Sequence, residues 1–153
     1  MMVELKRILL VEDSPQDVEL TLTALEEVNL ANEVLTLRDG EEALDYLYQR
    51  GRFERRGDGN PVCILLDIKM PKVDGLEVLR QIKSDEKLKQ IPVIMLTSSR
   101  EEQDLIRSYS LGVNAYVVKP VDFHDFLNAI KQLGMFWGIL NEVSPAEPFR
   151  EIE

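Results

Sequence analysis

The sequence predicts an α/β domain in which a parallel β-sheet is covered by helices on both faces. Short runs of apolar, often β-branched residues alternate with stretches in which apolar residues recur at helical spacing, and this alternation is typical of repeated βα units. Three of the apolar runs also end in charged residues, as expected where parallel strands reach a ligand-binding edge. A chain of 153 residues, 44% of them hydrophobic, is long enough for one such domain and too short for two ordinary ones.

The individual elements can be placed from their local patterns. We expect strands near residues 6 to 11, 33 to 38, 62 to 66, 92 to 96 and 115 to 118. Ser14 followed by Pro15 suits the start of a first helix, whose inward stripe comprises Val18, Leu22, Leu25 and Val28. Further helices are expected at 40 to 50, from Gly75 onward, at 100 to 111 with Gly112 after the end, and from Asp122.

Charge and cysteine content exclude several classes of function. The formal net charge of -10 argues against direct binding to nucleic acid or to an anionic membrane, because both need basic patches that neutralise phosphates. Cys63 is the single cysteine and sits in an apolar run, so we expect a buried, inert thiol and no internal disulfide. No apolar stretch is long enough for a signal peptide or a membrane span. We therefore expect a cytoplasmic protein.

The segment from Asp67 to Gly75 is the most informative part of the chain. An apolar run, Val62 to Leu66, ends at Asp67, and a loop that contains a proline and ends at Gly75 follows at once. A carboxylate beside an apolar interior needs a charge partner or a metal to offset its desolvation. Two other apolar runs end in Glu12-Asp13 and in Lys119-Pro120. Because parallel strand ends converge on one edge, these groups can form one Mg²⁺ site beside a nucleophilic carboxylate.

In combination, these motifs resemble the receiver domain of two-component response regulators, over roughly residues 5 to 134. The matching positions follow the family order: Glu12-Asp13 (acidic pair), Asp67 (phosphoacceptor), Met70-Pro71 and Asp74-Gly75 (following loop), Thr97 (switch hydroxyl), Tyr116 (switch aromatic) and Lys119-Pro120 (lysine with its usually cis proline). Three further features make the chain most similar to small response regulators that serve phytochrome-type histidine kinases: Glu12-Asp13-Ser14-Pro15, an insertion around Gly51 to Pro61, and Phe136-Trp137.

The resemblance implies a flavodoxin-like, doubly wound sheet with strand order 2-1-3-4-5, five helices and an extended last helix. It implies that Asp67 accepts a phosphoryl group from a sensor histidine kinase with the help of Lys119 and Thr97, and that Thr97 and Tyr116 switch the receiver surface. Mg²⁺ would be held by Asp13 and Asp67 directly, by Glu12 through a water, and by the backbone carbonyl of Lys69. We expect no enzyme activity beyond self-directed phosphoryl transfer and autodephosphorylation.

Three other functions are weighed against this one. A Mg²⁺-dependent phosphohydrolase with an aspartyl nucleophile, such as a haloacid dehalogenase relative, would need a second Asp two residues after Asp67, where the chain has Lys69. A pseudo-receiver that acts only by binding would usually have lost the acids. A flavodoxin-like cofactor binder would need a phosphate-cradling loop after the first strand, where the chain has Glu12-Asp13-Ser14-Pro15.

Two segments lie outside the common receiver pattern. The insertion from Gly51 to Pro61 is a glycine-punctuated basic loop, either a solvent-exposed connector or a partner contact. We divide the chain into a receiver domain, residues 1 to 134, and a C-terminal extension, residues 135 to 153. The extension is apolar around most of its helical circumference, so we expect it to form a homodimer contact through Met135, Phe136, Trp137, Ile139, Leu140 and Val143. The alternative is that the extension folds back and caps the helices of its own domain.

Overall fold

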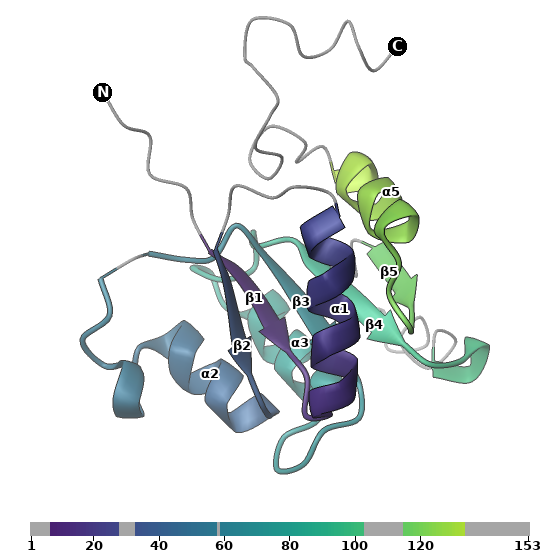
Figure 1. Ribbon diagram of the computed structural model, residues 1–153. Helices are drawn as coiled ribbons and strands as arrows, with labels where there is room; N and C mark the ends of the chain where they lie inside the picture. Colours follow the sequence, from purple (N-terminus) through teal and green to yellow (C-terminus); the bar gives the residue numbers. More distant parts are fainter. Residues whose placement is uncertain (1–6, 28–32, 58, 103–114, 134–153) are drawn as a thin grey trace, which may run out of the picture.

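The computed structural model describes residues 7–27, 33–57, 59–102 and 115–133 (Figure 1). The elements within these residues are β1 (Ile8–Val11), α1 (Pro15–Glu27), β2 (Val34–Leu37), α2 (Gly40–Tyr48), the 3-10 helix η1 (Gly51–Phe53), β3 (Cys63–Asp67), α3 (Gly75–Ser84), β4 (Val93–Thr97), β5 (Ala115–Val118) and α5 (Phe123–Leu133). Residues 100 to 102 begin the expected fourth helix. Its remaining residues, and Gly112, lie outside the described part.

The strands form one parallel sheet in the order β2-β1-β3-β4-β5. This order confirms the doubly wound, flavodoxin-like fold. From β1, the chain first adds β2 on one side and then β3, β4 and β5 in succession on the other side. In such a sheet the crevice for a ligand lies at the carboxyl ends of the strands where the order reverses, which here is the pair β1 and β3.

Each face of the sheet carries its own apolar core layer. Leu9 and Val11 of β1 belong to the layer beneath α2 and α3, and Ile8 and Leu10 belong to the layer beneath α1 and α5. Figure 1 shows these two pairs of helices on opposite faces of the sheet. Because β1, β3 and β4 are buried on both faces, they appear in the sequence as continuous apolar runs rather than as alternating ones.

Side-chain caps fix where the helices begin beside the strand ends. Asp39 accepts a hydrogen bond from the backbone N–H of Glu42 at 2.8 Å at the start of α2. Asp74 accepts one from Glu77 at 3.0 Å at the start of α3. At the start of α1, the Ser14 hydroxyl accepts one from the N–H of Asp17 at 3.3 Å, as the Ser14-Pro15 pattern predicts. A cap of this kind contributes about 1 kcal/mol to helix stability.

Gly75 lets α3 approach the strand end that carries Asp67. Its N–H donates to the carbonyl oxygen of Ile68 at 2.7 Å, and a Cβ added to Gly75 would lie 2.0 Å from the carbonyl oxygen of Asp67. Real Cβ atoms do not come this close to backbone oxygen, so the position requires glycine. The loop from Asp67 to Gly75 is thereby held tightly against its own strand.

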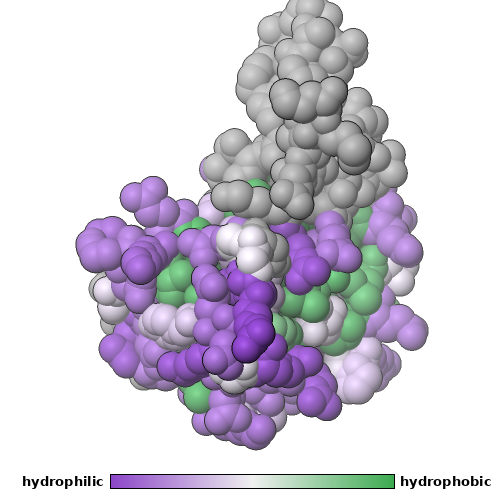
Figure 2. All heavy atoms as spheres, turned by 90° about the vertical axis from the view of Figure 1, so that its left-hand side faces the viewer, coloured by the Kyte–Doolittle hydropathy of each residue, from purple (hydrophilic) through white to green (hydrophobic). Residues whose placement is uncertain are grey.

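Most residues of the insertion between 51 and 57 are exposed, as the connector interpretation expects, but Phe53 and Arg56 are half-buried and pack on α2. Phe53 contacts Tyr46 edge to face, with ring centroids 5.1 Å apart. The Arg56 guanidinium lies 3.9 Å from the Tyr46 ring centroid, and its Nε donates to the Tyr46 carbonyl oxygen at 2.6 Å. Stacking of Arg56 on the face of Tyr46 therefore stabilises the contact between the insertion and α2. The α2 side of the molecule faces the viewer in Figure 2 and is mainly hydrophilic.

The expected extension of the last helix falls outside the described residues, as does the dimer contact of Met135, Phe136, Trp137, Ile139, Leu140 and Val143. Within the described ranges, no helix is long and apolar enough to cross a membrane. Cys63 is fully buried at the start of β3, and burial raises the pKa of its thiol to about 12. The expectation that this cysteine is buried is therefore confirmed, and its raised thiol pKa favours low reactivity.

Candidate functional site

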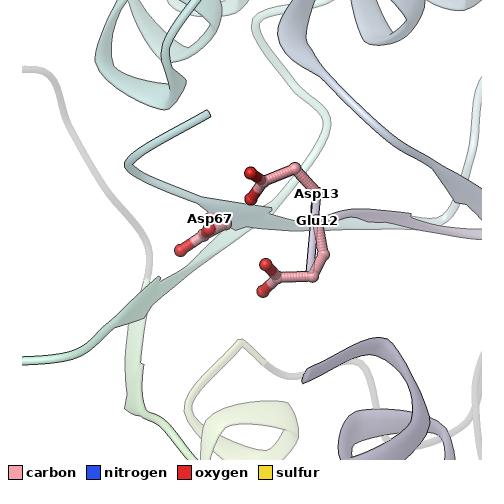
Figure 3. Close-up of side chains that lie close together, drawn as sticks. All are labelled: Glu12, Asp13 and Asp67. Carbon is pink, nitrogen blue, oxygen red and sulfur yellow. The ribbon is translucent and has the colours of Figure 1, made fainter. Parts of the chain in front are cut away.

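Three carboxylates meet where β1 and β3 end. Glu12 and Asp13 follow β1 directly, and Asp67 is the last residue of β3. One oxygen from each of the three lies within 4.8 Å of the others, and Figure 3 shows the three side chains turned toward one side of the strand ends. Glu12 is 1% exposed and Asp67 is 4% exposed, whereas Asp13 is exposed to solvent. The cluster therefore has a buried base and an open rim.

Lys119 brings a positive charge to this cluster from the end of β5. Its Nζ lies 3.2 Å from Oε1 of Glu12 and 3.1 Å from Oδ1 of Asp67. Its backbone N–H donates to the Thr97 carbonyl oxygen at 2.7 Å, so the end of β4 helps to hold it. The Lys119-Pro120 peptide bond is cis, as the resemblance implies. Two of the predicted acids, Glu12 and Asp67, are thus in direct contact with the predicted lysine.

Burial and mutual repulsion govern the protonation of the acids. Burial first, and the negative charge of Asp67 second, raise the pKa of Glu12 to about 7, although the N–H of Ser14 and Lys119 act against the rise. Burial also raises the pKa of Asp67, which Lys119 opposes. Burial alone would lower the pKa of Lys119, but its hydrogen bond to Asp17 and the charges of Asp67 and Glu12 together raise it. Lys119 therefore stays charged, but its single positive charge does not fully offset the burial and mutual repulsion of Glu12 and Asp67.

The donor set suits a hard divalent cation. Carboxylate oxygens are the ligands that Mg²⁺ and Mn²⁺ prefer, and a cation would offset the repulsion that raises the Glu12 pKa. The exposed Asp13 leaves room on the open side for the waters that Mg²⁺ retains. Glu12, Asp13 and Asp67 are the group of acids within the described chain that could hold such an ion.

The loops that flank Asp67 are joined by a second ion pair. Lys69 has an 83% exposed side chain, and its Nζ lies 3.8 Å from Oε2 of Glu102. Glu102 is 7% exposed, and its Oε1 accepts a hydrogen bond from the N–H of Ser98 at 2.7 Å. The Lys69 side chain therefore pairs with the start of the fourth helix, where Glu102 also binds the loop after β4, while the Lys69 backbone carbonyl is the part that the resemblance assigns to the metal.

The predicted switch residues lie on the two outer strands of this half of the sheet. Thr97 is the last residue of β4 and is fully buried. It follows Leu96, which pairs with Asp67 across the β3–β4 ladder. Tyr116 pairs with Met95 on β5, is half-buried, and packs against the core layer of α2 and α3. Thr97 thus lies at the end of the fourth strand and Tyr116 lies within the fifth strand, as the sequence predicted.

Asp17 is a contact of the site that the sequence analysis missed. It lies in the first turn of α1, and its Oδ2 is 3.0 Å from Nζ of Lys119. The available signal was an acid four residues after Asp13 in the sequence. An acid in the first turn is usually explained by the helix dipole, and that explanation conceals the long-range contact with Lys119.

The comparison with known families decides the identity of this arrangement. The model of the response regulator receiver domain matches residues 8–131, a range that contains all the residues of the site. The chain belongs to the response regulator receiver family. Its relatives are components of two-component signalling systems, and the receiver fold with strand order 2-1-3-4-5 is the one observed here.

Among receivers, this domain is similar to response regulators of phytochromes. It is 64% identical to the bacteriophytochrome response regulator AtBRR, whose structure superposes with a TM-score of 0.86 and a match covering 92% of this chain and 100% of that one. It is 42% identical over 132 residues to the response regulator Rcp1 of Synechocystis sp., covering 86% of this chain and 88% of Rcp1. The narrower likeness inferred from the motifs is therefore confirmed.

Two related structures were solved with the ligands that this site suggests. The cyanobacterial phytochrome response regulator RcpA was solved phosphorylated, with a TM-score of 0.70 and 42% identity over 88% of this receiver and 94% of RcpA. Rcp1 was solved in an Mn²⁺-bound form, with a TM-score of 0.70 and 42% identity over 91% of this receiver and 97% of Rcp1. Receiver domains bind a divalent metal, and this receiver has the acids for one.

Proposed function

We propose that this receiver accepts a phosphoryl group on Asp67 from a histidine kinase, in a reaction that requires Mg²⁺. The observation that carries the proposal is the contact of the Lys119 ammonium with Asp67 at 3.1 Å, together with the two further carboxylates, Glu12 and Asp13, that lie within 4.8 Å of Asp67 and of each other. A buried nucleophile, a fixed cation and a candidate metal site are the parts that phosphoryl transfer needs.

The chemistry is a single displacement at phosphorus. A carboxylate oxygen of Asp67 forms an O–P bond as the P–N bond to the donor histidine breaks, and the leaving imidazole nitrogen regains a proton from water. Lys119 offers positive charge to the phosphoryl oxygens, where negative charge gathers during transfer. The buried base of the site limits access of water to Asp67, which is 4% exposed.

Mg²⁺ is the cation that we assign to the acids. Asp13 and Asp67 would bind it directly, Glu12 through a water, and Lys69 through its backbone carbonyl. When bound, the ion supplies charge that neutralises the acids and the incoming phosphoryl oxygens. The likeness to Rcp1, solved with Mn²⁺, supports this assignment because the two ions share a preference for oxygen ligands.

Phosphorylation would be transmitted through Thr97 and Tyr116. The Thr97 hydroxyl would bond to a phosphoryl oxygen and draw the loop after β4 inward, and Tyr116 would fill the space so created. A receiver surface with two states then binds different partners in each. Fully buried Thr97, one position beyond the partner of Asp67, supports this route.

The partners follow from the same relatives. A sensor histidine kinase of the phytochrome type is the proposed donor, supported by the likeness to the bacteriophytochrome response regulator AtBRR. The chain would act as a signalling protein that forms a homodimer, without direct binding to nucleic acid or membrane, and without enzyme activity on other substrates.

The first prediction tests the nucleophile. Asp67→Asn should abolish incorporation of a base-labile phosphoryl group from acetyl phosphate, because an amide oxygen is a much poorer nucleophile than a carboxylate. Incorporation is measured by intact-protein mass spectrometry with and without Mg²⁺. Asp125→Asn, an exposed acid on α5, is the matched control and should label like the wild type. Labelling of Asp67→Asn at the wild-type rate would contradict the proposal.

The phosphohydrolase alternative gains no support at the position that distinguishes it. Such an enzyme would need an acid two residues after Asp67. Lys69 occupies that position, and its ammonium pairs with Glu102. The described structure thus offers no acid at this point to protonate a leaving group.

A further inference from the structure

The Lys119 ammonium has three carboxylate partners, and one of them lies outside the metal cluster. Oδ2 of Asp17 is 3.0 Å from Nζ, against 3.1 Å for Asp67 and 3.2 Å for Glu12. An ammonium group has three N–H donors and no acceptor. Three acceptors at these distances therefore saturate its donors.

Two of these three partners change their bonding when a phosphoryl group arrives. This step rests on the proposed function, in which an oxygen of Asp67 would become the bridging oxygen of an acyl phosphate and Glu12 would bind a water of the metal. Asp17 is not one of the acids that converge on the candidate metal position. It is therefore the partner of Lys119 that has no other part in the reaction.

The backbone of Asp17 is anchored by the start of α1. It lies in the first turn of α1, where its N–H donates to the Ser14 hydroxyl. The next residue, Val18, packs against the core layer beneath α1 and α5. The Asp17 side chain is 33% exposed, whereas that of Lys119 is 13% exposed. The lysine thus contacts both the buried nucleophile and a more exposed acid at the start of α1.

We propose that Asp17 is a positioning residue, which holds the Lys119 ammonium beside Asp67 while the phosphoryl group is transferred. A long lysine side chain loses considerable rotamer freedom when it is fixed. Asp17 fixes it before the donor binds, so less ordering remains for the transfer step. Asp17 acts through Lys119 and does not touch the phosphoryl group.

The test compares removal of the acid with a replacement that keeps its hydrogen-bond acceptor. Asp17→Ala removes the acceptor, and Asp17→Asn keeps an amide oxygen at the same place without the charge. Glu19→Ala removes an equal charge from an exposed position on the same helix and serves as the control. Rates of phosphorylation by acetyl phosphate are measured at saturating Mg²⁺, and Mg²⁺ affinity is measured separately by calorimetry.

We expect Asp17→Ala to slow phosphorylation roughly 3- to 10-fold, because a hydrogen bond to a charged group is lost at a partly exposed position. Asp17→Asn should recover most of that loss, and Glu19→Ala should match the wild type. Mg²⁺ affinity should change less than about twofold in Asp17→Ala, since Asp17 is not among the metal-facing acids.

A second measurement does not depend on phosphorylation. In ¹H–¹⁵N spectra of the metal-free protein, the Lys119 ammonium should give a resolved signal because its protons are held by three carboxylates. The signal should broaden beyond detection in Asp17→Ala and persist in Glu19→Ala. A retained signal together with an unchanged phosphorylation rate in Asp17→Ala would overturn the role of Asp17 alone. A wild-type protein that takes up no phosphoryl group would overturn the proposed function, and this role with it, even if the signal behaved as expected.

Discussion

Glu12 shows how one residue carries the electrostatic cost of building this site. It is almost fully buried, and its pKa is raised from the ordinary value of 4.5 to about 7, mainly by burial and then by the charge of Asp67. A carboxyl group with a raised pKa binds its proton more tightly in the folded state than in the unfolded state. Below about pH 4.5 it therefore costs no stability, and the cost grows as the pH rises toward 7.

We predict that the metal-free protein loses stability from this residue between pH 5 and 7.5. Across this pH range, the free energy of unfolding of the wild type should fall by roughly 2 to 3 kcal/mol more than that of Glu12→Gln. Mg²⁺ at pH 7.5 should recover part of the loss, because it favours the ionised acids. Urea unfolding with and without a chelator measures both effects. Parallel pH profiles for the two proteins would show that Glu12 does not carry this cost.

At the scale of the elements, the position of the site depends on close packing between α3 and the end of β3. Gly75 allows this contact, since a Cβ there would overlap the Asp67 carbonyl oxygen. We predict that Gly75→Ala lowers the free energy of unfolding by about 1 to 3 kcal/mol or more, as overpacking does elsewhere. It should also slow phosphorylation by shifting Asp67.

Gly57→Ala is the matched control for Gly75→Ala. A Cβ at Gly57 would meet nothing within 4 Å, so this variant should unfold within about 0.5 kcal/mol of the wild type, as surface substitutions usually do. Both variants are compared by urea unfolding. Equal stability of the two would mean that the backbone at Gly75 relaxes without cost.

The elements themselves were largely predictable, because apolar runs and helix starts are local signals. The expected strand at 62 to 66 appears as Cys63–Asp67, so Asp67 belongs to the strand rather than following it. Two features escaped prediction because they depend on contacts distant in sequence. The 3-10 helix η1 is held by Phe53 and Arg56 against Tyr46. Asp17 is placed beside Lys119 by the packing of α1 against α5 in the same core layer.

The site itself was predicted from strand ends, and its geometry was not. The parallel sheet brings Glu12, Asp13 and Asp67 together wherever β1 and β3 are neighbours, and this adjacency follows from the fold. The burial difference between Glu12 and Asp13 could not be read from two adjacent acids. It depends on which side of the strand end each side chain leaves.

At the scale of the whole molecule, we propose that this acidic receiver, with a net charge of -10, contacts a second copy of itself through apolar residues. The apolar residues of the C-terminal extension, outside the described ranges, are our proposed homodimer contact. Burying Phe136 and Trp137 would contribute about 3 to 6 kcal/mol before the cost of association. A two-fold dimer would also present two acceptor sites to a dimeric kinase.

We predict that the full-length protein is a dimer at tens of micromolar and that truncation after Gly134 makes it a monomer. Light scattering measures the mass of both. A shorter truncation that removes residues 147 to 153 keeps the proposed contact and should leave the dimer intact. A monomeric full-length protein, or a dimer that survives truncation after Gly134, would exclude this segment as the contact.

The single cysteine gives the molecule a built-in reporter of its central strand. Cys63 begins β3, the strand that ends at Asp67, and it is fully buried with a thiol pKa near 12. A thiol reagent can therefore modify it only when that strand separates from its neighbours. The rate of modification therefore measures how often β3 opens. If Mg²⁺ slows the modification, the size of that effect measures how much a ligand at one end of the strand stabilises the sheet against opening.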